Sequence, residues 1–204
     1  MPAYEFTEDW FSRHAGVWRQ ILERFAPRRL LEIGSYEGCS ACFLIDECGK
    51  AGPVDLHCID TWQGGIEHDP ATMAEVEARF DRNLDLAVQA APNPVTVTKH
   101  KAASTVALAH LMTAEPAAGF DLIYIDGSHQ APVVLADAVM AFQLLRVGGI
   151  MIFDDYLWSR QEAGQQDFYD LPKPAIDAFV NIYQRKLGLI GAPLYQLYAQ
   201  KIAS

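Results

Sequence analysis

The sequence contains no run of about 18 apolar residues, the length that a membrane-spanning helix requires, so no transmembrane helix is expected. It is also poor in positive charge: 16 Lys and Arg stand against 26 Asp and Glu, and the net charge is −10. Such a field repels nucleic acid and anionic membranes, so neither is an expected partner. No basic residue precedes Arg13, a pattern unlike that of a signal peptide, and we expect a cytoplasmic protein.

Cysteine is absent from most of the chain, because all four cysteines lie between residues 39 and 58. Cys39 and Cys42 have a C-x-x-C redox spacing, but Cys58 falls inside a predicted strand and the intervals match no zinc pattern. We interpret all four as small buried hydrophobic residues in a reducing compartment.

The chain length suits one domain over residues 1–204, with 1–27 as an N-terminal helical lid or extension. Apolar runs that predict buried strands alternate with amphipathic stretches that predict helices. The expected strands are 29–33, 55–60, 95–99, 120–126 and 150–154, then 187–190 and 194–201. The expected helices are 8–25 with Thr7 as its cap, 39–48, 73–90, 104–114, 131–145 and one from Pro172 or Pro174 to about 188.

This alternation predicts a Rossmann-like α/β fold, a doubly wound and mostly parallel sheet with helices on both faces. Only a short turn separates the last two strands, whereas a parallel pair needs a crossover of about a dozen residues or more. We therefore expect the last strand to be antiparallel.

A turn between the first strand and the next helix has the pattern Glu32-x-Gly34-x-x-x-Gly38. Gly34 permits a tight turn, and Gly38 would let a ligand approach the helix N-terminus. Asp60 ends the second strand, where its carboxylate can accept hydrogen bonds from ribose hydroxyls. A nucleotide-type cofactor is therefore expected at this edge of the sheet.

Two cofactors compete for this turn. Dinucleotide enzymes prefer G-x-G-x-x-G, but here Ser35 and Tyr36 stand where that pattern needs room, and Glu32 would face a phosphate badly. An acidic residue suits a ligand that carries an amino group and a sulfonium, such as S-adenosylmethionine.

Acidic residues also follow two later strands. Asp126 comes after the run 120–125, with His129 three residues on, and Asp154 and Asp155 come after the run 149–153. Because ligands bind beyond the carboxyl ends of the strands in such sheets, these side chains should meet at one rim. Three carboxylates suit a hard cation such as Mg²⁺ or Mn²⁺. The alternative is that Asp126 only positions the cofactor amine and that Asp154 and Asp155 cap a loop.

With these motifs the chain resembles class I S-adenosylmethionine-dependent methyltransferases over essentially its whole length, including the antiparallel end of their seven-stranded sheet. The resemblance implies that Gly34 and Gly38 lie against the methionine part, that Asp60 holds the ribose and that Trp62 flanks the adenine. The full set of cofactor-binding residues that we assign is Glu32, Gly34, Ser35, Tyr36, Gly38, Asp60, Thr61, Trp62, Ala103, Ser104 and Asp126.

The acidic residues are similar to those of metal-dependent macrolide-sugar O-methyltransferases and, more loosely, of the catechol type. That resemblance implies that Asp126, Asp154 and Asp155 hold the metal and that His129 is the general base beside Asp126. The first of the paired acids is commonly glutamate in the sugar enzymes, so the shorter Asp154 leaves its direct ligation open. His129 as a structural histidine is the alternative.

The sequence thus predicts a methyltransferase acting on a hydroxyl of a small molecule, with a homo-oligomer left open. Its rivals are a non-catalytic S-adenosylmethionine-binding protein and a nicotinamide-dependent oxidoreductase. The long aromatic loop 156–170, joined by Trp10, Phe11 and Trp18, is either a lid over the substrate or part of the core or of a dimer surface.

Overall fold

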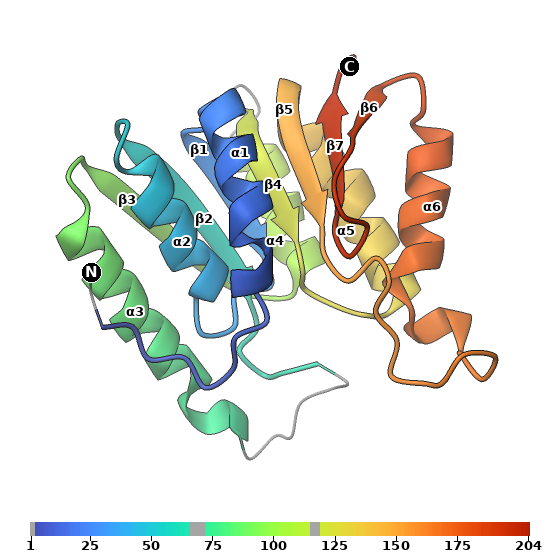
Figure 1. Cartoon of the computed structure of the whole chain (residues 1–204), viewed down its shortest axis with the longest axis horizontal. Coiled ribbons are helices and arrows are strands. Elements are labelled where there is room, and N and C mark those ends of the chain that lie inside the picture. The colour runs from blue at the N-terminus through green and yellow to red at the C-terminus, as the bar shows by residue number, and fades with distance from the viewer. Residues whose placement is uncertain (1–2, 66–71, 115–118) are drawn as a thin grey trace.

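A computed structural model describes residues 3–65, 72–114 and 119–204. In these residues one seven-stranded sheet has the order β3-β2-β1-β4-β5-β7-β6 (Figure 1). The strands are β1 (Arg29–Ile33), β2 (Val54–Asp60), β3 (Val95–Lys101), β4 (Phe120–Ile125), β5 (Leu145–Phe153), β6 (Leu187–Ile190) and β7 (Leu197–Lys201).

The sheet is parallel from β3 to β5, and β7 runs antiparallel to both of its neighbours, β5 and β6. The predicted Rossmann-like fold with an antiparallel last strand is therefore confirmed. The short turn before β7 suits its antiparallel pairing with β6, and β7 lies between β5 and β6.

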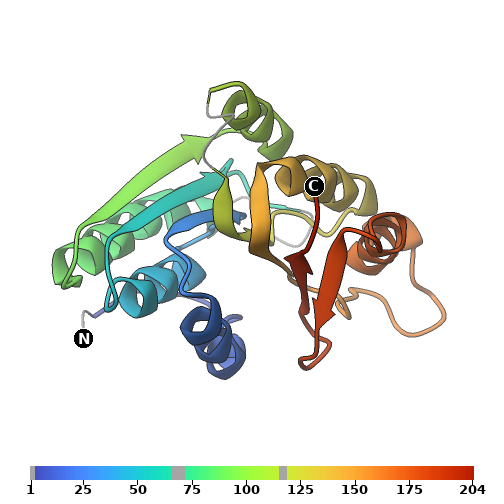
Figure 2. The ribbon, with the colours of Figure 1, turned by 90° about the horizontal axis from the view of Figure 1, so that it is seen from above.

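Helices cover both faces of the sheet, as Figure 2 shows from above. One face carries α1 (Ala15–Phe25), α2 (Cys39–Cys48) and α3 (Val76–Ala90). The other carries α4 (Ser104–Ala114), α5 (Ala131–Leu144) and α6 (Pro172–Ile182). Three short 3₁₀ helices complete the described elements: η1 (Ser12–His14), η2 (Thr72–Glu75) and η3 (Phe168–Asp170).

Alternate residues of the central strands enter the two cores, because successive side chains of a strand point to opposite faces. Leu30 of β1 lies in the core under α1 to α3, and Leu31 lies in the core under α4 to α6. The central strands are therefore apolar on both sides, which is why they read as continuous hydrophobic runs rather than alternating ones.

The first helix begins later than the sequence predicted. Residues 8–11 are not helical; η1 starts at Ser12, whose backbone N–H donates to the Asp9 carboxylate at 2.9 Å. Thr7 does not cap the helix, because its N–H and hydroxyl donate to Glu37 instead. At the other end of the chain, α6 stops at Ile182 and not near Gly188.

All four cysteines are free, as predicted, and three of them are buried. Burial raises the pKa of Cys39, the half-buried one, to about 12, which disfavours the thiolate that redox chemistry needs. No helix among the described residues is long and apolar enough to cross a membrane.

Candidate active site

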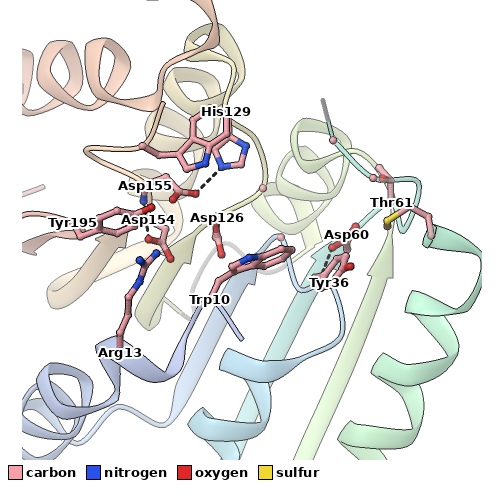
Figure 3. Close-up of a pocket in the computed structure, with 16 residues that line it drawn as sticks. Trp10, Arg13, Tyr36, Asp60, Thr61, Asp126, His129, Asp154, Asp155 and Tyr195 are labelled. Atoms are coloured by element: carbon pink, nitrogen blue, oxygen red, sulfur yellow. Dashed lines mark hydrogen bonds and ion pairs between the residues drawn. The ribbon is translucent and has the colours of Figure 1, made fainter. Parts of the chain in front are cut away.

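Four neighbouring strands end at the same level, which brings the predicted motifs together. The register pairs Ile33 of β1 with Ile59 of β2 and with Ile125 of β4, and Ile125 with Phe153 of β5. A pocket of about 350 Å³ lies beyond these ends. The pocket is lined by Gly34, Asp126 and Asp154, which follow β1, β4 and β5, and by Asp60, the last residue of β2 (Figure 3).

Gly34 has a left-handed backbone, with φ of 89°, and it faces the backbone of the neighbouring strand end. A Cβ atom at this position would lie 2.1 Å from the carbonyl oxygen of Asp126 and 2.6 Å from the Cα of Gly127. The close approach of two chain segments therefore requires glycine here, whether or not a ligand also lies against it.

Gly38 is left-handed as well, but it does not line the pocket. A Cβ atom there would lie 2.5 Å from the Cδ2 atom of Leu84 on α3. The motif predicts that this glycine lets a ligand approach, whereas in the structure it gives room for the packing of α3 against the turn.

Asp60 holds the turn that follows β1. Its Oδ2 atom accepts the backbone N–H groups of Ser35 and Tyr36, each at 2.9 Å, and Oδ1 accepts that of Trp62 at 2.7 Å. A carboxylate oxygen can accept more than one hydrogen bond, so Oδ1 retains capacity for a ligand hydroxyl. Asp60 and the next residue, Thr61, both line the pocket.

Tyr36 and Trp62 support each other beside Asp60. Both have left-handed backbones, with φ of 46° and 53°, which is uncommon for aromatic residues. The indole Nε1 of Trp62 donates to the Tyr36 carbonyl at 2.9 Å, and its ring is buried against Phe80. Tyr36 lines the pocket, whereas Trp62, the residue expected to flank the adenine, lies behind the turn.

Glu32 and Ser35 are buried beneath the turn and do not line the pocket. The Ser40 hydroxyl donates to Glu32 at 2.5 Å. Burial raises the pKa of Glu32 to about 7, an effect that the hydrogen bond from the Ser40 hydroxyl opposes. Ala103 and Ser104 at the start of α4 also lie outside the pocket lining.

Asp126 and Asp154 are joined by a buried tyrosine. The Tyr124 hydroxyl lies 2.9 Å from Oδ2 of Asp126 and also contacts Oδ2 of Asp154. The side-chain amide of Gln196, just before β7, donates to the same Asp154 oxygen at 2.9 Å. Neighbouring strands therefore supply both the acids and the groups that hold them.

The environment of these acids disfavours their charged forms. Asp126 is exposed to the pocket, but partial desolvation by the surrounding walls raises its pKa, and the charges of Asp154 and Asp155 raise it further. Burial also raises the pKa of Asp154, and the Asp155 charge adds to that effect. A cation beside these carboxylates would relieve the repulsion.

His129 and Asp155 form a pair at the opposite end of the pocket from Asp60 (Figure 3). The Nε2 atom of His129 lies 2.7 Å from Oδ2 of Asp155. The imidazole also stacks on the Trp158 ring, with centroids 3.8 Å apart and planes 14° apart. The contact with Asp155 and the stacking on Trp158 together fix the orientation of the imidazole ring.

The predicted metal ligands are brought to one rim, but Asp155 turns its carboxylate to His129. Within the described residues, no group of three or more His, Cys, Asp or Glu side chains is arranged to hold a metal ion. Asp126 and Asp154 remain adjacent, and two carboxylates are enough for Mg²⁺ when water supplies its other ligands.

Arg13 and Tyr195 are among the pocket residues that no sequence motif indicated. Arg13 of η1 and Tyr195, before β7, line the pocket, and the Arg13 guanidinium lies over the Tyr195 ring at 3.9 Å. They come from opposite ends of the chain, so no local pattern links them. Trp10 and Trp158, whose role the sequence left open, also line the pocket.

A family model described as a methyltransferase domain matches residues 31–156 of the chain. A probable S-adenosylmethionine-dependent methyltransferase of Mycolicibacterium smegmatis is 33% identical over 73 residues, 36% of this chain. That match covers 24% of the relative, so the chain corresponds to about a quarter of its length.

Solved structures are similar over nearly the whole chain. An O-methyltransferase from Bacillus cereus in complex with S-adenosylhomocysteine has a TM-score of 0.62 at 16% identity, covering 98% of this chain and 84% of that one. The O-methyltransferase TomG from Streptomyces achromogenes, in complex with S-adenosylmethionine, has a TM-score of 0.61 at 13% identity, covering 96% and 82%. At these identities the likeness shows the shared fold.

Proposed function

This chain belongs to the methyltransferase-domain family, and we propose that it transfers a methyl group from S-adenosylmethionine to a hydroxyl group of a small molecule. One observation carries the proposal. A single pocket has the Asp60 turn at one end and the paired His129 and Asp155 at the other. A donor and an acceptor can therefore meet inside it.

Asp60 and the turn it holds form the cofactor end. The spare capacity of the Asp60 carboxylate suits a ribose hydroxyl, and Gly34 keeps the turn close to the end of β4. Because Asp60 also accepts three backbone N–H groups, the turn is already ordered before a ligand arrives. Such preorganisation reduces the entropy that binding must overcome.

His129 is the general base in this proposal. Its Nε2 atom lies 2.7 Å from the Asp155 carboxylate, and in this proposal the neutral imidazole accepts the proton of the acceptor hydroxyl. The bond from sulfur to the methyl carbon then breaks as the bond from that carbon to the acceptor oxygen forms. Asp155 stabilises the imidazolium that results, as the carboxylate does in other histidine pairs.

A divalent cation belongs to the same proposal. Asp126 and Asp154 would hold Mg²⁺ or Mn²⁺, since their oxygens suit a hard cation and their like charges are close together. When bound, such an ion lowers the pKa of a hydroxyl group beside it. Asp155 contacts His129 and is not assigned to the cation. This arrangement differs from the three-acid site that the sequence suggested.

Calorimetry with S-adenosylhomocysteine tests the cofactor half of the proposal. We expect binding in the micromolar range, and the Asp60→Ala variant should bind about 1–3 kcal/mol more weakly because charge-assisted hydrogen bonds are lost. A thermal melt must accompany the variant, because Asp60 also holds the turn. Wild-type protein that binds no S-adenosylhomocysteine would end the proposal.

Transfer of a labelled methyl group to a panel of sugars and phenols tests the reaction. Each acceptor is run with Mg²⁺, with Mn²⁺ and with a chelator, and we expect turnover on at least one acceptor that the chelator lowers. Turnover that is equal in all three conditions would remove the cation from the proposal and leave His129 as the base. Cofactor binding without turnover on any acceptor would favour the non-catalytic alternative.

A further inference from the structure

The N-terminal segment, residues 4–14, crosses the rim of the sheet. Hydrogen bonds fasten it to residues 34–38, the turn between β1 and α2, which we call the cofactor turn. The Glu37 carboxylate accepts the Thr7 N–H at 2.6 Å and the Thr7 hydroxyl at 2.8 Å. Asn83 of α3 bonds to both backbone groups of Glu5, each at 2.9 Å. Glu37 and Asn83 are each only 1% exposed, so these bonds are shielded from water.

These fastenings place Trp10 over the pocket. Its ring lies 5.1 Å from the Tyr36 ring, at an angle of 45°. In Figure 3 Trp10 lies between Asp60 and Tyr36 on one side and Asp126 on the other. It is 50% exposed, although it lines the pocket, so part of its surface is available for a ligand to cover.

The middle of the pocket is where a methyl donor must present its reactive group. In the proposed function the ribose lies at Asp60 and the acceptor hydroxyl lies at His129, so the sulfonium lies between them. An aromatic ring attracts a cation to its face, and an indole does so most strongly. We infer that Trp10 binds the positively charged sulfonium of S-adenosylmethionine through its indole ring.

This inference rests on the proposed function and adds to it a binding residue that comes from outside the cofactor turn. Asp126 and Tyr36 line the pocket beside Trp10, and the Asp126 carboxylate is already bonded to the Tyr124 hydroxyl. Replacement of Trp10 removes the attraction of the indole to the cation, while the charge of Asp126 and the ring of Tyr36 are unchanged.

The test compares three ligands that differ in the charge of the group at one position. S-adenosylmethionine has a sulfonium and sinefungin has an ammonium group in the corresponding place, whereas the sulfur of S-adenosylhomocysteine is neutral. Dissociation constants are measured by calorimetry for the wild type, Trp10→Leu and Trp10→Phe. Phe6→Leu serves as the matched control, because Phe6 is an aromatic residue of the same segment outside the pocket lining.

We expect Trp10→Leu to weaken binding of both cationic ligands by roughly 3- to 30-fold relative to S-adenosylhomocysteine. Trp10→Phe should keep part of the preference, and Phe6→Leu all of it. An equal loss for all three ligands would mean that Trp10 only covers the site, and unchanged affinities would mean that it does not touch the ligand; either result overturns the inference. If the wild type binds none of the three, the proposed function itself fails.

Discussion

His129 is constrained by the Asp155 carboxylate at one edge and by the Trp158 ring on one face. We expect His129→Ala to reduce turnover by roughly 10²- to 10⁴-fold with little change in cofactor affinity, because a general base acts on the acceptor. Asp155→Asn keeps the imidazole but not the charge beside it. That variant should therefore keep part of the activity and shift the acid limb of the pH–rate profile.

Single-turnover rates measured between pH 6 and 8, together with calorimetry for S-adenosylhomocysteine, check this prediction. A His129→Ala enzyme with full turnover over that range would reduce the residue to a structural role. Loss of cofactor affinity in the same variant would instead place the imidazole at the donor end.

Gly34 offers a second test at the level of one atom. In Gly34→Ala the new Cβ atom would lie 2.1 Å from a backbone oxygen that cannot rotate away, and φ is 89°. We expect a loss of more than about 2 kcal/mol in the free energy of unfolding, from strain and from displacement of the 126–127 backbone. The structure therefore predicts that substitution of Gly34 impairs folding and not only ligand binding.

Gly16→Ala is the matched control, because Gly16 lies within α1 and a Cβ atom there meets nothing within 4 Å. This substitution should stabilise the protein by about 0.5–1 kcal/mol, since alanine favours the helix. Urea denaturation of both variants measures the two effects. Equal stability of Gly34→Ala and the wild type would show that the turn can move away from β4.

At the scale of elements, the N-terminal segment depends on Glu37. This buried carboxylate also accepts from the Nε atom of Arg79 at 2.5 Å, so it joins the segment, the cofactor turn and α3. In Glu37→Gln the charge is lost and one amide N–H faces another donor. We expect amide exchange in residues 4–14 to rise by roughly 10- to 100-fold, as opening there costs less.

Hydrogen exchange read by mass spectrometry measures this opening, with Thr7→Val as the graded control. That variant loses the hydroxyl bond to Glu37 and retains the backbone N–H, so its effect should be smaller. Exchange that rises equally in α2 and in the central strands would indicate global destabilisation and contradict a local fastening.

The elements of the sheet could be read from the sequence, and the N-terminal segment could not. Residues 150–153 of β5 are apolar on both faces, so a local pattern defines that strand. Trp10 and Phe11 precede Val17 and Trp18 by seven residues, which is a helical spacing, yet Phe11 lies in the core and Trp10 lines the pocket. Contacts with Glu37 and Asn83, remote in sequence, override the local preference there.

At the scale of the whole molecule, the sequence predicts those site residues that lie at or just after the ends of strands. Asp60, Asp126, Asp154 and His129 line one pocket because parallel strands end at one rim. Arg13 and Tyr195 were not predicted, since only the folded chain brings its two ends together. The roles of Glu32 and Gly38 beneath the turn depend on helix packing, which a motif does not reveal.

Stability of the whole molecule should vary with pH through Asp137 on α5, which is 1% exposed. Burial raises its pKa from 3.8 to about 6, and neither of its carboxylate oxygens has a hydrogen-bond partner among the described residues. The folded state therefore binds more protons than the unfolded state between these values, and stability falls as pH rises through them. A shift of about two pH units corresponds to about 3 kcal/mol.

The histidines act in the opposite direction, since burial lowers the pKa of His14 to about 4 and also lowers that of His57. Wild-type stability alone would mix the two effects, so the comparison is with Asp137→Asn. The variant should gain about 2–3 kcal/mol relative to the wild type between pH 4 and pH 7, and nothing further up to pH 8. Urea denaturation at these pH values measures the difference. A difference that stays constant with pH would show that Asp137 ionises as easily in the folded protein as in the unfolded chain.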